Sequence, residues 1–436
     1  MNNALPTIMH SFSVSQSTVQ WLSTGYLMVA GLMIPISAWV FKRFNIKQTY
    51  LLMMIIFLIG SILGYLAPNF SILLIGRLIQ AIAAGSLIPM IQNVVLMVYP
   101  VAQRGAAMGM TGIVVAFAPA IGPTLSGFLI DDYGWRSLFL VLIPLTLIVF
   151  ILAVIFTKNI NDVQKDPLDI WSLILSMGGF GAVLYSFSII GNQGHLTLPV
   201  VVTFFVGLIL VTIFVKRQLK LTSPLIEMRV FKNKIFSITA ILSAISNISM
   251  LGVELIMPLY LQNVHGVTAL TSGLVLLPGA LVMAILNPIS GRLFDKFGIF
   301  KLSIFGYSIL ALGTLPMFTF GLQANLIEVS VLYAIRMVGI ALVMMPTFTA
   351  GVNALSPELA IQGNAASSTV RQIAGSLGTA VLMMLVSLFS SSNQHASLET
   401  LNNGYHAAFV VALIMAVVGF LLSFTLKNSK QKQSKN

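Results

Sequence analysis

The stretch GRLIQAIAAGSLIPM, residues 76–90, decides the fold because a counterpart recurs in the second half of the chain. It places Arg77 inside an apolar run. Pro100 and the small-residue segment QRGAAMG, which begins at Gln103, follow it. A proline ends or bends a helix, and small residues let helix backbones approach closely in lipid. The pattern therefore indicates two membrane helices separated by a break.

The counterpart is IRMVGIALVMMPTF from Ile335, which is followed by Pro357 and by QGNAASS from Gln362. From the arginine to the glycine of the small-residue segment, the two units measure 28 and 27 residues. Parallel repeats of this kind build secondary transporters, whose substrate site lies near the middle of the membrane between the two halves. The sequence therefore predicts two related helical bundles.

Composition supports a membrane protein. Of 436 residues, 57% are hydrophobic and 8% charged, whereas a soluble domain carries about 25% charged residues. The chain has no cysteine, which excludes disulfides and thiol chemistry. Thirteen apolar runs are long enough to span about 30 Å of hydrocarbon as helices. They lie near residues 19–41, 48–68, 71–98, 105–130, 136–157, 169–190, 197–215, 235–261, 269–294, 299–321, 326–350, 362–391 and 405–426.

The net charge of +12 raises the possibility of a nucleic-acid partner. If the loop that contains Lys42 faces the cytoplasm and the runs alternate, nineteen of the 23 lysines and arginines lie on the cytoplasmic side. Basic residues accumulate in cytoplasmic loops, so the charge reflects topology and no nucleic acid is expected. The sequence predicts a multi-pass protein of the cell membrane with a cytoplasmic C-terminus.

Residues 1–10 are too short to cross a bilayer, and we interpret them as the outer half of a first helix that begins before this sequence. The predicted fold class is an all-α membrane protein with fourteen spans, of which the first is truncated. The expected organisation is an N-terminal bundle over 1–157, an inserted helix pair over 158–220 and a C-terminal bundle over 221–426. A cytoplasmic tail over 427–436 follows.

Several stretches resemble one family. They are NALPTI (3–8), QWLSTGYLM (20–28), GRLIQAIAAGSLIP (76–89), APAIGPTLSGFL (118–129) and MPLYLQNVHGVTALTSGLVLLPGAL (257–281). Together they resemble the major facilitator superfamily (MFS), and within it the fourteen-helix drug:proton antiporters of the EmrB/QacA type (DHA2). The resemblance implies an MFS fold of two six-helix bundles plus two inserted helices, and multidrug efflux by antiport against protons. It assigns Pro119, Gly122, Pro123 and Gly127 to the antiporter motif.

Two departures from the family pattern concern charged residues. Lys42 stands where the loop after the second helix normally has an acid, whereas GRLFDKFG from Gly291 keeps the pattern with Arg292, Asp295 and Lys296. The resemblance therefore implies a charged gating loop in the second half. The first-helix aspartate of the family would precede this sequence.

Glu254 is the single acid, among eleven in the chain, that falls inside a predicted span. Ionisable groups within a membrane are expensive to bury and mark ion and substrate pathways. Ser243, Asn247, Met250 and Glu254 follow a spacing of four, three and four residues, which places them on one helix face. We expect this face to line a substrate cavity in which a proton and a cationic drug compete for Glu254. The alternative is a structural ion pair between Glu254 and Arg336 or Arg371.

Other intramembrane polar residues allow two interpretations each. Arg77 is a candidate for proton coupling, or it caps helix carbonyls and holds helices together. Gln80 and Asn93 are candidates for the cavity lining, or they form helix–helix hydrogen bonds.

Other function classes lack their signatures. The chain has no Gly-Lys pair, so an ATP-binding loop is absent. No cluster of metal ligands or catalytic groups is visible, so we expect neither an enzyme nor a metal or cofactor. A proton-coupled exporter of an endogenous lipid or metabolite remains an alternative, and a channel is a weaker one. The expected partners are small lipophilic or cationic substrates, protons and membrane lipids, and we expect a monomer.

Overall fold

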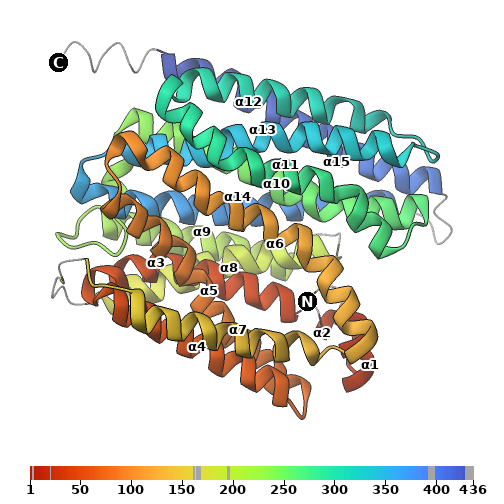
Figure 1. Cartoon of the computed structure of the whole chain (residues 1–436), viewed down its shortest axis with the longest axis horizontal. Helices are drawn as coiled ribbons and strands as arrows, with labels where there is room; N and C mark the ends of the chain where they lie inside the picture. The colour runs from red at the N-terminus through yellow and green to blue at the C-terminus, as the bar shows by residue number, and fades with distance from the viewer. Residues whose placement is uncertain are drawn as a thin grey trace. The chain divides into compact units, whose positions relative to one another are not determined.

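The computed structural model describes residues 1, 4–19, 21–160, 163, 168–193, 197–390 and 398–427. Within these residues the regular structure is helical (Figure 1). The α-helices are α1 (Leu5–Phe12), α2 (Gln16–Val19), α3 (Trp21–Arg43), α4 (Ile46–Leu66), α5 (Phe70–Val98), α6 (Arg104–Tyr133), α7 (Ser137–Phe156), α8 (Ile170–Gln193), α9 (Leu198–Gln218), α10 (Lys234–His265), α11 (Ala269–Phe297), α12 (Ile299–Thr314), α13 (Leu326–Asn353), α14 (Pro357–Ser390) and α15 (Leu398–Ser423).

The thirteen predicted spans correspond to α3 through α15, which confirms the all-helical fold class. Among the described residues, twelve of these helices are long and apolar enough to cross a membrane, and α6 is not among the twelve. Helix boundaries differ most for α12, which ends seven residues before the end of its predicted run, and for α15, which begins seven residues before its predicted run. The added turns of α15, LETLNNG from Leu398, are polar, and hydropathy therefore misses them although they continue the same helix.

The chain divides into two compact units. The first contains residues 1–94, 122–181 and 207–226, and the second contains residues 95–121, 182–206 and 227–436. The predicted grouping into two bundles and an inserted pair follows different boundaries and stays a prediction.

The first unit has a core of aromatic and aliphatic side chains near α1. Trp135, which precedes α7, and Phe139, in the first turn of α7, are buried with Ile8, Leu22 and Leu73. The Trp135 and Phe139 rings meet edge to face with their centroids 6.2 Å apart, an arrangement that aromatic pairs prefer. The short helix α1 is therefore held to the unit by apolar packing.

The second unit is organised around α10 and α13. Helix α10 packs against α13, α14 and α15, and α13 also packs against α11 and α12. Close backbone approach makes these contacts possible: a Cβ at Gly339 of α13 would lie 2.5 Å from the backbone nitrogen of Leu310 on α12. Small residues serve this purpose at helix interfaces in membranes.

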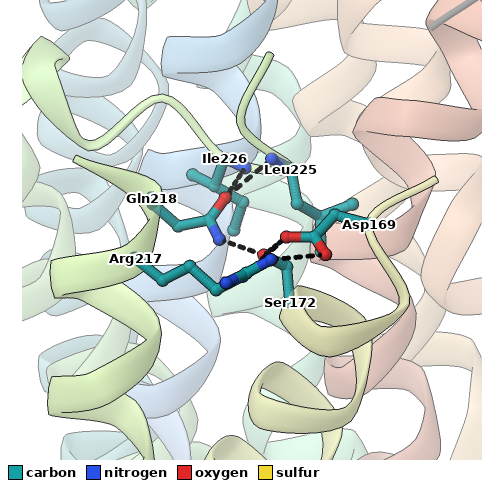
Figure 2. A network of polar contacts seen from close by, with 6 residues as sticks. All are labelled: Asp169, Ser172, Arg217, Gln218, Leu225 and Ile226. Carbon is teal, nitrogen blue, oxygen red and sulfur yellow. Dashed lines mark hydrogen bonds and ion pairs between the residues drawn. The ribbon is translucent and has the colours of Figure 1, made fainter. Parts of the chain in front are cut away.

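A polar network ties the first turn of α8 to the end of α9 (Figure 2). The Arg217 guanidinium donates from Nε to Asp169 Oδ2 at 2.7 Å and from Nη2 to Oδ1 at 2.9 Å. Ser172 donates to Asp169 at 2.6 Å, and Gln218 donates to the Ser172 hydroxyl at 2.6 Å. These contacts close the ends of the two helices with charge-assisted hydrogen bonds.

Gln218 extends this network to the segment that leads towards α10. Its side-chain oxygen accepts from the backbone nitrogens of Leu225 at 2.7 Å and Ile226 at 3.3 Å. The Gln218 side chain is fully buried, so it satisfies two backbone donors that would otherwise lack partners. The sequence reasoning did not find this network, although the charges at both ends of an otherwise uncharged helix pair were a signal for it.

Candidate functional site

Glu254 lies in the second half of α10, a helix of 32 residues. Asn233 begins the helix by accepting hydrogen bonds from the backbone nitrogens of Ile235 and Phe236, as N-cap residues do. Gly266, with a φ of 66°, ends it. Local sequence signals thus fix both ends of the helix that carries the predicted coupling residue.

The Glu254 side chain is half-buried, and its Oε2 is buried with no hydrogen-bond partner among the described residues. The side-chain ion pairs in the described part of the chain join Arg217 to Asp169 and Arg229 to Glu227. Glu254 therefore takes part in neither, and it forms no ion pair with Arg336 or Arg371 in this conformation. A buried oxygen without a partner is costly, which marks this carboxyl as unusual.

Arg336 on α13 is fully buried in the same unit as Glu254. Its Nη2 donates to both the backbone carbonyl and the hydroxyl of Ser249, the latter at 2.7 Å, which ties α13 to α10. Its Nε and Nη1 have no hydrogen-bond partner among the described residues. Arg336 and Glu254 interact electrostatically, but their charged atoms are more than 4.0 Å apart, outside ion-pair contact.

Tyr333 lies one turn before Arg336 on α13 and is also buried. It interacts electrostatically with both Glu254 and Arg336. The sequence reasoning missed Tyr333 and Ser249. The spacing of three residues between Tyr333 and Arg336 was the available signal, because residues three apart share a helix face.

The predicted cavity face of α10 packs against neighbouring helices in this conformation. Ser243 shares a hydrogen bond with Thr347 of α13 at 2.8 Å, and Asn247 donates to the backbone carbonyl of Arg371 on α14 at 2.6 Å. Met250 is buried in the apolar core of the second unit. The structure therefore brings these three side chains to helix interfaces, and their lining of a cavity stays a prediction.

Arg371 lies on α14 in the same unit. It donates from Nη2 to Ser368 at 2.9 Å, and its guanidinium lies 4.4 Å from the ring centroid of Phe348. Such stacking of a guanidinium on an aromatic face is attractive.

Arg77 lies in the first unit, where it forms a polar cluster with α3 and α4. It donates from Nη1 to Gln80 at 2.8 Å, and its guanidinium lies 4.2 Å from the ring centroid of Tyr26. Gln80 in turn donates to Ser61 at 2.8 Å. Asn93, near the end of α5, is buried in the same unit. For Gln80 the geometry is that of a helix–helix hydrogen bond.

The segment predicted to be a gating loop, residues 291–296, is not a loop: it forms the last turns of helix α11, and it contacts the start of α6. The Asp295 carboxylate accepts from the backbone nitrogens of Gly105 at 3.1 Å and Ala106 at 3.0 Å. A carboxylate is stabilised at a helix N-terminus because the unpaired backbone donors point at it. A Cβ at Gly105 would lie 2.6 Å from the carbonyl oxygen of Gly291, so both glycines permit the close approach.

Arg292 and Lys296, the bases of the same helical segment, are exposed. Lys296 Nζ lies 5.3 Å from the ring centroid of the neighbouring Phe297. The acid of this segment therefore contacts α6, and the two bases do not take part in that contact.

The residues predicted to form an antiporter motif lie in α6. The two glycines of this motif, Gly122 and Gly127, are positions where an added Cβ would meet no described atom within 4 Å. The side chains of Pro119 and Pro123 lie outside the described residues. Close packing of α6 occurs earlier, where Asn287 of α11 donates to the backbone carbonyl of Gly112 at 2.8 Å.

Comparison with known proteins defines the class of protein. Residues 1–379 match the sequence model of the Major Facilitator Superfamily. The human organic anion transporter MFSD10 (TETRAN) has a similar fold, with a TM-score of 0.66 over 95% of this chain and 88% of that one, at 13% sequence identity. The chain belongs to the Major Facilitator Superfamily, and its members in these comparisons are transporters.

Bacterial relatives match along nearly the whole chain. The uncharacterized MFS-type transporter YcnB of Bacillus subtilis (strain 168) is 44% identical over 98% of this chain and 91% of its own length. The lincomycin resistance protein LmrB of Listeria innocua serovar 6a is 36% identical over 99% of this chain and 93% of its own length.

Proposed function

We propose that this protein is a proton-coupled exporter of lipophilic drugs, many of them cationic, with Glu254 as the group that couples proton and substrate. The observation that carries the proposal is the buried, unpaired Oε2 of Glu254 within a helix of a transporter fold. The similarity to a protein named lincomycin resistance protein LmrB supports export of drugs.

The proposed mechanism is competition at one carboxyl. Ionised Glu254 attracts a cationic substrate, and protonation of Glu254 removes that attraction. Because the carboxyl has no ion-pair partner in this conformation, no fixed contact must break before a proton or a substrate binds. Each pH unit across the membrane supplies about 1.4 kcal/mol per proton, and 100 mV adds about 2.3 kcal/mol per charge moved.

The contact of Asp295 with the first turn of α6 supports a gating role for the end of α11. It joins α11 to α6 through a carboxylate and two backbone donors. Such a contact can break and reform as helices move, because each backbone donor can exchange the carboxylate for water. We propose that this contact holds one end of the transporter closed.

The experiment is uphill transport in proteoliposomes with an imposed pH gradient. Glu254→Gln keeps the size of the side chain but cannot ionise, so gradient-driven accumulation of a cationic dye should fall by about 100-fold, a loss of roughly 2.7 kcal/mol of coupling. Glu254→Asp, which keeps a carboxyl, is the matched control and should retain part of the activity. Wild-type rates in Glu254→Gln would contradict the proposal.

A second comparison tests the substrate class. A protonophore should abolish export of the dye, and lincomycin should compete with it. Export of neither compound, with proton release on addition of a cell extract, would instead favour an endogenous metabolite as the substrate.

A further inference from the structure

The second unit contains two opposite charges that the fold holds near one another without joining them. Glu254 comes from α10, and Arg336 comes from α13. They interact electrostatically but lie outside ion-pair contact. Both have buried polar atoms without hydrogen-bond partners: Oε2 of the acid, and Nε and Nη1 of the base.

The Arg336 guanidinium is anchored to Ser249 of α10. Ser249 takes two hydrogen bonds from Arg336 Nη2, one through its backbone carbonyl and one through its hydroxyl. Ser249 and Glu254 lie on the same helix. The hydrogen bonds to Ser249 use one nitrogen of the guanidinium, Nη2, and the other two nitrogens remain available as donors. The arginine is thus positioned, but its hydrogen-bonding capacity is only partly used.

The buried donors Nε and Nη1 of Arg336 and the buried acceptor Oε2 of Glu254 lack hydrogen-bond partners, which a ligand or water could supply. An unpaired buried donor or acceptor costs about 1–3 kcal/mol, more when it is charged, and proteins tolerate such groups mainly where they have a function. A molecule that offers an acceptor to Arg336 and a donor or cation to Glu254 would satisfy both at once.

We propose that Glu254 and Arg336 together form a two-charge binding site for dipolar lipophilic substrates, with an amine or other donor held by Glu254 and a carboxylate or carbonyl oxygen held by Arg336. This inference rests on the proposed export function and specifies its substrate class. A guanidinium stays charged under all ordinary conditions. The ionised pair is therefore neutral overall, and it favours a zwitterion over a simple monocation.

The same arrangement strengthens the proposed coupling. When Glu254 takes up a proton, the positive charge of Arg336 is left without a counter-charge. The amine end of the substrate then loses an attraction and also meets a repulsion. Arg336 acts in this step as a specificity-determining and positioning residue, because it sets the net charge of the site.

The test measures binding of two matched dyes to the purified, full-length chain in detergent by fluorescence polarisation. One dye is a rhodamine ester, a monocation, and the other is the same rhodamine as its free carboxylic acid, a zwitterion. Wild-type protein should bind the zwitterion more tightly. Arg336→Gln should weaken binding of the zwitterion by about tenfold, the loss expected for one charge-assisted hydrogen bond, and should leave the monocation unchanged or bound more tightly. Arg336→Lys, which keeps the charge without the planar fork, should lie between the two.

Equal weakening of both dyes, or no change in either, would overturn the two-charge site. Because Arg336 also links α13 to Ser249, its substitution could weaken binding by disturbing the fold. A second variant, at Glu254, tests the site without removing that link. Glu254→Gln should weaken the monocation more than the zwitterion, whose carboxylate Arg336 still holds; the reverse order would also refute the inference. These binding results are independent of gradient-driven transport, so a failure here is distinguishable from a failure of the proposed export function.

Discussion

The pair Asp169–Arg217 and the pair Glu254–Arg336 combine the same chemical groups in opposite ways. Asp169 and Arg217, at the ends of α8 and α9, form two parallel hydrogen bonds at 2.7 and 2.9 Å (Figure 2). Glu254 and Arg336, inside α10 and α13, stay outside ion-pair contact with buried polar atoms unpaired. The first pair remains partly exposed, whereas Arg336 is fully buried.

The difference shows that the position of an acid and a base along their helices determines whether the two form an ion pair. At a helix end, the two groups keep part of their hydration while they bond, so pairing is inexpensive and closes the helix pair. In a membrane interior each charge is expensive to place, and a closed ion pair would leave nothing for a substrate or proton to bind. An unpaired acid and base in that setting are consistent with the proposed binding site, which a ligand would complete.

Exchanging the acid and the base within each pair should give the largest difference in dye efflux between the two pairs. The double variant Asp169→Arg with Arg217→Asp rebuilds a pair between helix ends, and dye efflux should stay within about twofold of wild type, as for an ion pair of small net contribution. The double variant Glu254→Arg with Arg336→Glu should lower efflux by about 100-fold, because Ser249 then faces a carboxylate and the coupling acid is displaced.

Efflux rates in vesicles, normalised to the amount of folded protein, measure both exchanges. A functional Glu254–Arg336 exchange would mean that the two residues act only as an ion pair in some other conformation.

Asp295 offers a third kind of acid, satisfied by backbone donors, and its substitution should have an intermediate effect. Asp295→Asn weakens the contacts to Gly105 and Ala106, and it should increase opening at this end of α6 by about fivefold. Since the chain has no cysteine, a single Ala107→Cys reports opening: this position is 6% exposed and should react faster with a maleimide in the variant. The exposed neighbour Lys296→Gln is the control and should leave the labelling rate unchanged; equal rates in both would show that the contact is no gate.

The smallest effect is expected at the paired acid. Hydrogen bonds from Arg217, assisted by Ser172 and opposed in part by burial, lower the pKa of the Asp169 carboxyl from 3.8 to about 2. A lowered pKa stabilises the folded state fully above about pH 4, and the benefit disappears as the pH falls through about 2. Asp169→Asn should therefore lower the Tm by about 1–3 °C at pH 7.

Thermal unfolding in detergent across a pH series checks this sign. The Tm difference between wild type and Asp169→Asn should shrink between about pH 4 and pH 2. A difference that grows on acidification would mean that Asp169 is not held ionised by its partners.

Sequence patterns predicted the helices well, because apolar length is a local property and lipid demands it. Thirteen apolar runs became thirteen helices, and the polar first turns of α15 were missed because hydropathy does not register them. Asp295 was also singled out, from its place in a charged motif that the structure puts in the last turns of α11; its gating role stays a prediction. The hydrogen-bond partners of Asp295 are the backbone nitrogens of Gly105 and Ala106. They were not predicted, because a backbone nitrogen leaves no side-chain signal in the sequence.

The candidate site was predicted only in part. Glu254 stood out because a lone acid in an apolar run is rare, but Ser249 and Tyr333 are ordinary residues whose importance depends on what lies across the helix interface. The polar stripe of Ser243 and Asn247 was visible in sequence, yet its use in contacts to α13 and α14 was not.

The sequence by itself determined that this chain spans a membrane many times, which loops carry its basic residues and which acid is placed inside a span. These properties depend on hydropathy and charge along one chain segment. Only the tertiary structure decided which charges pair, as Asp169 and Arg217 do, and which stay apart, as Glu254 and Arg336 do. Pairing depends on the distance between groups on different helices, and that distance is set by packing between helices, which no single segment encodes.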